Sequence, residues 1–269
     1  MLLVCATLME VRACLSRLPV PGGLDFFASD PAAFAGGRDS YGVPFSFPSL
    51  CLPGCVLELL VCGVGPIASA LALGRYLGRE RAVPSKAPLR GILNLGIAGS
   101  YDAIRAPLGS LVLATEELYP EYGVWPHHEN GHPPVPLPLS FPQTEIAGKK
   151  VFNRLALEPH MTLGNLGLTC HSEWRRGASI TVAGVSGTPE RAVRTAALGS
   201  GFTDDAGPAL TENMEGFSLA LGAAVEGLHF VELRAASNEA GTRPPRGWDM
   251  PAALTALGQG TRQLLEPFL

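Results

Sequence analysis

Short apolar runs alternate with helix-like segments along this chain, and that alternation most constrains its fold. Candidate strands occupy residues 2–7, 56–62, 91–95, 110–114, 180–185 and 229–236, and candidate helices occupy residues 67–77 and 214–226. Strands that alternate with helices form mainly parallel sheets that are covered on both faces. The sequence therefore predicts an α/β fold with a central, mainly parallel sheet and helices on each side.

Two long segments do not follow this pattern. Residues 19–53 are rich in Pro, Gly, Phe and Ser, and residues 119–143 carry six prolines between Pro126 and Pro142. Loops of this length are usually lids, oligomer contacts or mobile segments. The strands on either side of each segment are expected in one sheet, so we expect a single domain over residues 1–269 with two long loops.

Composition and charge exclude several classes of protein. The 269 residues carry a formal net charge of −4, without the basic excess that holds a nucleic-acid backbone. No window contains the roughly 18 apolar residues of a membrane span. The apolar N-terminus lacks basic residues and is interrupted by Glu10, which favours a strand followed by a helix over a signal peptide. We therefore expect a cytoplasmic protein that binds neither nucleic acid nor membrane.

Metal and disulfide sites are also not expected. Six cysteines are too few for a disulfide scaffold at this length. Cys51 and Cys55 have no second pair to complete a zinc site. The cluster around His127, His128 and His132 contains proline and glycine, which prevent the helical face that would align metal ligands.

In parallel sheets, ligands bind beyond the carboxyl ends of the strands. The residues after the candidate strands are small, polar or acidic: 7–10, 63–65, 96–100, 186–188 and 237–238. Few cations lie among them, which suits a neutral, hydroxyl-rich ligand. Gly63, Gly65 and Ala68 fit a relaxed dinucleotide fingerprint, but the acidic residue expected about 20 positions later is absent. We interpret these glycines as tight strand–helix packing and expect no cofactor.

The most specific segment runs from Thr211 to Gly216, with the sequence Thr-Glu-Asn-Met-Glu-Gly. Its two acids flank Asn-Met at the expected start of a helix, where negative charge is favourable. A plain capping arrangement, with Thr211 as the cap, would explain the acids but does not require the methionine. Some twenty residues later, an apolar strand ends in Arg234-Ala-Ala-Ser237-Asn238.

These two motifs, together with Asn-Leu-Gly-Ile-Ala-Gly-Ser at residues 94–100, resemble the nucleoside phosphorylase/nucleosidase superfamily, and within it the futalosine hydrolase family. The resemblance implies a nucleoside phosphorylase-like fold with a mixed, mainly parallel sheet. It implies a homo-oligomeric enzyme of menaquinone biosynthesis that hydrolyses the N-glycosidic bond of futalosine and releases hypoxanthine. The alternatives are a methylthioadenosine/adenosylhomocysteine-type nucleosidase, a purine nucleoside phosphorylase, or a nucleoside-binding protein without catalysis.

The resemblance also implies roles for substrate-binding residues. Met214 would pack on the ribose, and Glu215 would accept hydrogen bonds from the ribose hydroxyls, which suits an acceptor-only carboxylate. Gly99 would bring the backbone close to the base and the sugar, and Ser237 would lie beside them. Trp248 resembles an aromatic residue that lines the 5′ side of the pocket.

Glu10 and Asn238 are the implied catalytic residues. Glu10 would activate water, although an acid at the start of a helix can also serve only as a cap. The amide of Asn238 offers an acceptor and a donor together, so it can hold a protonated ring nitrogen and donate to a 6-oxo group. This favours hypoxanthine over adenine as the leaving group. The early turns carry no arginine for a phosphate, which favours water as the nucleophile.

Overall fold

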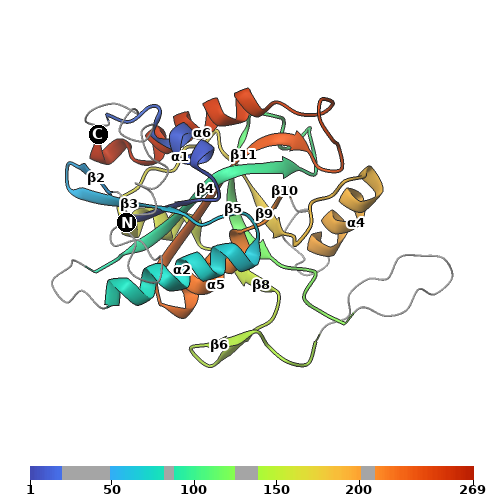
Figure 1. Cartoon of the computed structure of the whole chain (residues 1–269), viewed down its shortest axis with the longest axis horizontal. Coiled ribbons are helices and arrows are strands. Elements are labelled where there is room, and N and C mark those ends of the chain that lie inside the picture. The colour runs from blue at the N-terminus through green and yellow to red at the C-terminus, as the bar shows by residue number, and fades with distance from the viewer. Residues whose placement is uncertain (20–48, 82–87, 125–138, 201–209) are drawn as a thin grey trace, which may run out of the picture.

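A computed structural model describes residues 1–19, 49–81, 88–124, 139–200 and 210–269 (Figure 1). Nine strands within these ranges form one sheet: β1 Leu2–Cys5, β2 Ser49–Leu52, β3 Cys55–Val61, β4 Gly91–Ser100, β5 Leu111–Leu118, β8 Arg154–Ala156, β9 Arg175–Thr181, β10 Thr211–Asn213 and β11 His229–Glu239. Their order is β10-β9-β5-β11-β4-β1-β3-β2, and β8 pairs with β5. Parallel pairs such as β1–β4 and β4–β11 occur beside the antiparallel pair β5–β11, which confirms a mixed sheet.

Helices cover both faces of this sheet, as the sequence predicts (Figure 1). The described helices are α1 Leu8–Leu15, α2 Pro66–Arg81, α3 Pro159–Leu166, α4 Pro189–Ser200, α5 Gly216–Val225 and α6 Met250–Leu264. Successive side chains of a strand point to opposite faces. Leu3 of β1 therefore packs in the core under α1, α3 and α6, whereas Leu2 packs with Leu73 of α2 and Leu219 of α5.

The short strand β10 closes part of the sheet into a ring. It runs parallel to β9 and antiparallel to β4, and β4, β11, β5 and β9 are already neighbours. The register places Thr211 opposite Ser100 and Glu212 opposite Gly99. The acidic motif is thereby fixed beside the carboxyl end of β4.

This closure corrects two expectations. Thr211 does not cap a helix, because residues 211–213 form β10, and Glu215 takes the N-cap position of α5. Residues 96–100 are not a turn after a strand, because β4 continues to Ser100 with β11 on one side and β10 on the other. Pairing on both sides stabilises extended backbone that the glycines alone would disfavour.

Other strands also differ from the predictions. β5 spans residues 111–118 rather than 110–114. β11 extends to Glu239 and contains Ser237 and Asn238, with a register shift after Ala236. β9 spans residues 175–181 rather than 180–185. β2 lies inside the first predicted loop, where it pairs with β3.

Most of the two predicted loops lies outside the described residues, at 20–48 and 125–138, as does the cluster of His127, His128 and His132. Downstream of residues 125–138, β6 Thr144–Ile146 and β7 Lys149–Val151 form a separate two-stranded hairpin. In the described part of the chain, no helix is both long enough and apolar enough to cross a membrane.

Candidate functional site

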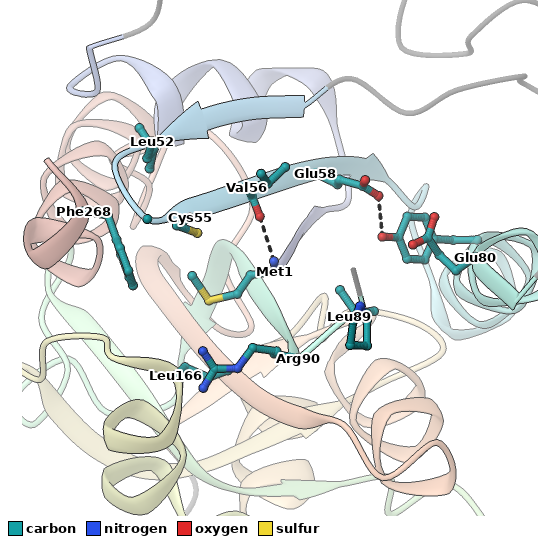
Figure 2. A pocket seen from close by; sticks show the side chains of 13 residues that line it. Met1, Leu52, Cys55, Val56, Glu58, Glu80, Leu89, Arg90, Leu166 and Phe268 are labelled. Carbon is teal, nitrogen blue, oxygen red and sulfur yellow. Dashed lines mark hydrogen bonds between the residues drawn. The ribbon is translucent and has the colours of Figure 1, made fainter. Parts of the chain in front are cut away.

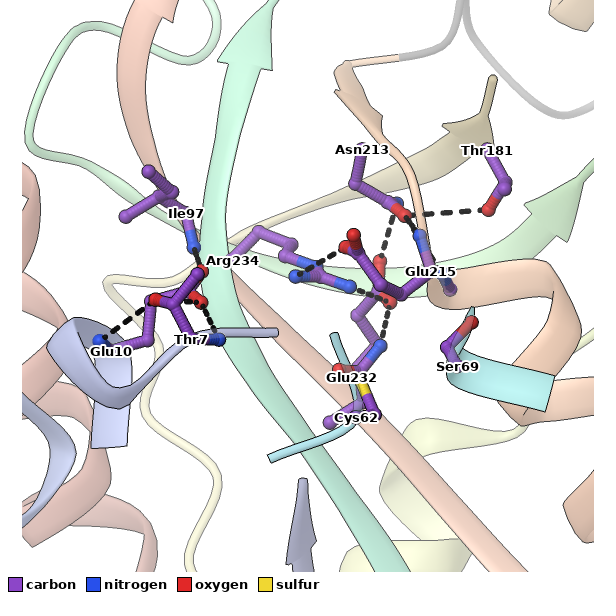
Figure 3. Close-up of polar contacts among 12 residues, drawn as sticks. Thr7, Glu10, Cys62, Ser69, Ile97, Thr181, Asn213, Glu215, Glu232 and Arg234 are labelled. Atoms are coloured by element: carbon purple, nitrogen blue, oxygen red, sulfur yellow. Dashed lines mark hydrogen bonds and ion pairs between the residues drawn. The ribbon is translucent and has the colours of Figure 1, made fainter. Parts of the chain in front are cut away.

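The carboxyl ends of β1, β3 and β4 meet beside the start of α5. Figure 3 shows Glu10, Glu215 and Arg234 brought together there from three distant parts of the chain. All three side chains are buried. This is the edge of the sheet at which ligand-binding groups are expected, because ligands bind beyond the carboxyl ends of parallel strands.

Glu10 lies at the third position of α1, and its carboxylate has two structural roles. Its Oε2 accepts hydrogen bonds from the backbone N–H (2.9 Å) and hydroxyl (2.8 Å) of Thr7, the N-cap residue, which completes a capping box. Its Oε1 accepts from the backbone N–H of Ile97 at 3.0 Å. The helix-start interpretation of Glu10 is therefore correct, and the same carboxylate also joins α1 to β4 inside the cluster.

Glu215 is held at both its backbone and its side chain. Asn213 Oδ1 accepts from the backbone N–H of Glu215 at 2.8 Å and of Gly216 at 2.7 Å. The Glu215 Oε1 atom accepts from the backbone N–H of Gly65 at 3.1 Å, where a φ of +98° favours glycine. Burial raises the pKa of Glu215, and the positive charge of Arg234 opposes that shift.

Arg234 is the one buried basic residue within the described ranges, and it lies among three carboxylates. Its Nη2 donates to Glu232 Oε2 at 3.0 Å, and its Nη1 lies 3.8 Å from Glu215 Oε2. A Cβ atom added to Gly96 would meet both Arg234 Nη1 and Glu10 Oε1 (2.7 Å). Burial alone would lower the pKa of Arg234, but Glu232, Glu215 and Glu10 together raise it, so the guanidinium stays charged.

The cluster is thus rich in negative charge with one cation. Burial also raises the pKa of the nearby Cys62 to about 12, which keeps it a neutral thiol. Fixed negative charge in a buried site stabilises positive charge that develops on a substrate, such as an oxocarbenium-like sugar. Arg234 belongs to one of the sequence motifs, but no role was predicted for it; the available signal was a lone arginine inside an apolar strand.

Asn238 lies next to Gly99 across the β4–β11 ladder. A Cβ atom on Gly99 would stand 3.2 Å from Asn238 Nδ2, so glycine leaves room there. Ser237 Oγ donates to Asn238 Oδ1 at 2.9 Å, and Asn238 Nδ2 donates to the backbone oxygen of Glu239 at 3.1 Å. An amide has two acceptor sites on its oxygen and two N–H donors. Asn238 uses one acceptor site and one N–H in its bonds to the described residues, so one of each remains for a ligand.

The remaining predicted substrate-binding residues lie around this edge. Met214 is half-buried against the cluster that contains Ile180. Trp248 is half-buried, forms a β-bridge with Asn238 and donates from Nε1 to the backbone oxygen of Thr242 at 3.3 Å. The structure brings Trp248 beside Asn238, whereas Glu10 lies on α1 and Met214 and Glu215 lie between β10 and α5.

Glu212, the first acid of the motif, holds the segment that follows β9. Its Oε1 accepts from the backbone N–H of Ser186 at 2.8 Å, and its Oε2 accepts from the hydroxyls of Ser186 (2.5 Å) and Tyr101 (2.8 Å). This carboxylate fixes a loop at the carboxyl edge of the sheet. This role of Glu212 was not predicted from the sequence.

A cavity lies at the opposite end of the sheet from this site (Figure 2). Its volume is about 740 Å³, and Met1, Arg90 and Phe268 are among its lining residues. Glu58 accepts there from the hydroxyl of Tyr76 at 2.5 Å. The lining of this cavity does not include any residue of the predicted site. In the described part of the chain, no group of three or more His, Cys, Asp or Glu residues could hold a metal ion.

Comparisons with known proteins agree with this geometry. The family model described as "Phosphorylase superfamily" matches residues 13–266. A futalosine hydrolase of Thermus thermophilus is 31% identical over 256 residues, which cover 93% of this chain and 92% of the relative. A futalosine hydrolase of Streptomyces coelicolor is 31% identical over 236 residues, or 84% of this chain and 90% of the relative.

Solved structures share the fold at lower identity. The native futalosine hydrolase of Helicobacter pylori superposes with a TM-score of 0.61 at 14% identity, covering 99% of this chain and 97% of that chain. A methylthioadenosine/adenosylhomocysteine nucleosidase of Colwellia psychrerythraea in complex with adenine gives 0.62 at 17% identity, covering 98% and 91%.

Proposed function

The chain belongs to the phosphorylase superfamily and, within it, to the futalosine hydrolase family, and we propose that it hydrolyses the N-glycosidic bond of futalosine. The products are hypoxanthine and dehypoxanthine futalosine, in menaquinone biosynthesis. The observation that carries this proposal is the placement of Asn238 beside Gly99, at the same edge of the sheet as the buried cluster of Glu10, Glu215 and Arg234.

Asn238 recognises the leaving group. Its Oδ1 keeps an acceptor site for a protonated imidazole-ring nitrogen of the purine, and its Nδ2 keeps an N–H for the 6-oxo group. An ionised aspartate would offer no donor to that carbonyl and would fit a 6-amino group instead. The amide has no acidic proton to give, so the ring nitrogen takes its proton from solvent as the C–N bond breaks, and the purine leaves as a neutral base. The proton that the attacking water loses to Glu10 then returns to solvent.

Glu215 and Glu10 act on the sugar and on water. The ionised Glu215 accepts hydrogen bonds from the ribose hydroxyls, with Met214 packed on the ring. The Glu10 carboxylate already accepts three hydrogen bonds, and a carboxylate has about four acceptor sites, so one remains for the attacking water. Glu10 takes the proton of that water while the negative cluster stabilises the oxocarbenium-like sugar.

Water is the nucleophile rather than phosphate. The one buried arginine of the described residues, Arg234, is engaged by Glu232 and flanked by Glu215, so it is not available to a phosphate. A phosphate dianion would also meet the repulsion of the Glu10 and Glu215 carboxylates.

The test is chromatography of the products from futalosine, inosine and methylthioadenosine, with and without phosphate. Hypoxanthine from futalosine in phosphate-free buffer is the expected result. Adenine from methylthioadenosine would select the nucleosidase alternative, strict phosphate dependence would select a phosphorylase, and tight nucleoside binding without turnover would leave a binding protein. Asn238→Ala should lose at least about tenfold in kcat/KM, whereas the exposed control Asn165→Ala should not change it.

We also propose that the protein forms a homo-oligomer and is located in the cytoplasm. Ile67 (83% exposed) and Leu71 (54%) lie on the outer side of α2, and Val64 (58%) lies just before it, where a second copy could bury them. The six cysteines are free thiols, which is typical of proteins in a reducing compartment. Sedimentation velocity of the wild type and of Ile67→Glu would test the assembly, and an unchanged monomer in both would contradict it.

A further inference from the structure

Two buried glutamates behind the site are not used by the mechanism above. Glu117 of β5 and Glu232 of β11 are both fully inaccessible to solvent. They meet at the start of α5, where a Cβ atom on Gly216 would lie 2.5 Å from Oε2 of each. Charged groups are rarely buried without partners, because desolvation is costly.

Glu232 is the centre of a hydrogen-bond network. Four side chains from four strands donate to its carboxylate: Asn94 Nδ2 at 2.6 Å, Ser179 Oγ at 2.7 Å, Arg234 Nη2 at 3.0 Å and Asn213 Nδ2 at 3.2 Å. A carboxylate that accepts several hydrogen bonds, one of them from a guanidinium, is stabilised in its ionised form.

Two of those donors lead directly to the ribose-binding residue (Figure 3). The Nη1 atom of Arg234 lies 3.8 Å from Oε2 of Glu215. Asn213 uses its oxygen to hold the backbone N–H of Glu215 at 2.8 Å. Glu232 thereby fixes both the counter-charge and the backbone position of Glu215.

Glu117 has a different environment. Its Oε2 accepts one long hydrogen bond, 3.5 Å, from Thr181, and its Oε1 has no partner among the described residues. Two carboxylates side by side in a buried space cannot both be ionised, so one must hold a proton. Burial, and then the charge of Glu232, raise the pKa of Glu117. Burial would also raise the pKa of Glu232, but Arg234 and the hydrogen bonds lower it.

We propose that Glu117 and Glu232 form a buried pair sharing one proton, in which neutral Glu117 donates to ionised Glu232 and Glu232 orients Arg234 and Asn213 around Glu215. Both are positioning residues, since neither belongs to the group of side chains assigned to the substrate. The inference rests on the proposed function, because its kinetic readout is the reaction at Glu215.

The pair makes opposite predictions for two isosteric variants. Glu117→Gln keeps an N–H that can donate to Glu232 and removes no charge, so kcat/KM should stay within about threefold of the wild type. Glu232→Gln removes the charge that orients Arg234 and turns an amide N–H toward its donors, so kcat/KM should fall about a hundredfold, mainly through KM. Glu58→Gln, a buried glutamate at the opposite end of the sheet, is the matched control and should not change kcat/KM.

The pH profile separates positioning from a general loss of structure. The charged groups around Glu215 are Arg234 and Glu232 from β11 and Glu10 from α1; the other groups that contact Glu232, on β4, β9 and β10, are neutral. The charge of Glu232 contributes to raising the pKa of Glu215. In Glu232→Gln the acid limb of kcat/KM should therefore move to lower pH, and in Glu117→Gln it should stay in place.

Infrared spectroscopy gives a readout independent of activity. The carbonyl stretch of a buried, protonated carboxylic acid should be present in the wild type at neutral pH and lost in Glu117→Gln. If Glu232→Gln does not fold, the comparison of Glu117→Gln with Glu117→Ala remains, and only the alanine variant should lose activity. Loss of activity in a folded Glu117→Gln variant, or a missing acid band in the wild type, would overturn the pair. A wild type with the band but no release of hypoxanthine would instead refute the proposed function.

Discussion

Replacing Arg234 with methionine tests the electrostatic logic of the site most directly. The guanidinium is 1% exposed and lies 3.0 Å from Glu232 and 3.8 Å from Glu215. Methionine fills similar volume without charge, so the substitution leaves buried carboxylates with no counter-charge. Breaking a buried ion pair by removing one partner costs about 3–5 kcal/mol. The unfolding entropy is about 2.1 cal/mol/K per residue, so for a chain of this size each kcal/mol lowers Tm by about 2 °C and we expect a fall of roughly 5–9 °C.

The loss of thermal stability in Arg234→Met should depend on pH. Without Arg234, the pKa values of Glu215 and Glu232 rise, because burial is no longer opposed by a positive charge. A carboxyl whose folded pKa is raised penalises folding above that pKa, and the penalty fades as the pH falls toward the unfolded value. The difference in Tm between wild type and Arg234→Met should therefore be larger at about pH 8 than at about pH 5.

Thermal unfolding followed by circular dichroism at both pH values is the assay. Arg246→Met, at an exposed position, is the control and should leave Tm unchanged at either pH. An Arg234→Met variant as stable as the wild type, or one whose deficit is equal at both pH values, would refute the claim that Arg234 compensates buried carboxylates.

Three further substitutions probe single contacts. Glu10→Gln keeps an oxygen that can accept from Ile97, so α1 should persist while kcat falls about 10²–10⁴-fold; a loss of helix in circular dichroism, or an unchanged kcat, would contradict the role as base. Glu212→Gln weakens the hold on Ser186, and KM should rise about tenfold with kcat less affected; an unchanged KM would separate this loop from the site. Gly96→Ala places a methyl group between Arg234 and Glu10, so kcat/KM should fall about a hundredfold while the strand survives; wild-type kinetics would show that the cluster tolerates the shift.

The sequence predicts the layers of this fold well, because apolar runs of strand length are local signals. β1, β3 and α2 lie within a few residues of the predicted ranges. The short strand β10 was missed, because its residues Thr-Glu-Asn carry no apolar pattern and it is stabilised by pairing with β9 and β4. The extension of β4 to Ser100 was missed for the same reason: glycine-rich backbone became strand only through neighbours that are distant in the sequence.

The network around Glu232 shows why site residues are harder to predict than strands. The period of two puts Glu232 and Arg234 on the same face of β11, which can be read from the sequence alone. Their partners are set by the register between β11 and β4, which places Glu232 opposite Asn94 and Arg234 opposite Gly96. A slip of one residue would turn both charges to the other face of the sheet, into the apolar core under α1 and α6. The buried charges therefore disfavour every register that is shifted by an odd number of residues, so the residues that organise the proposed site also restrict the alignment of the two central strands.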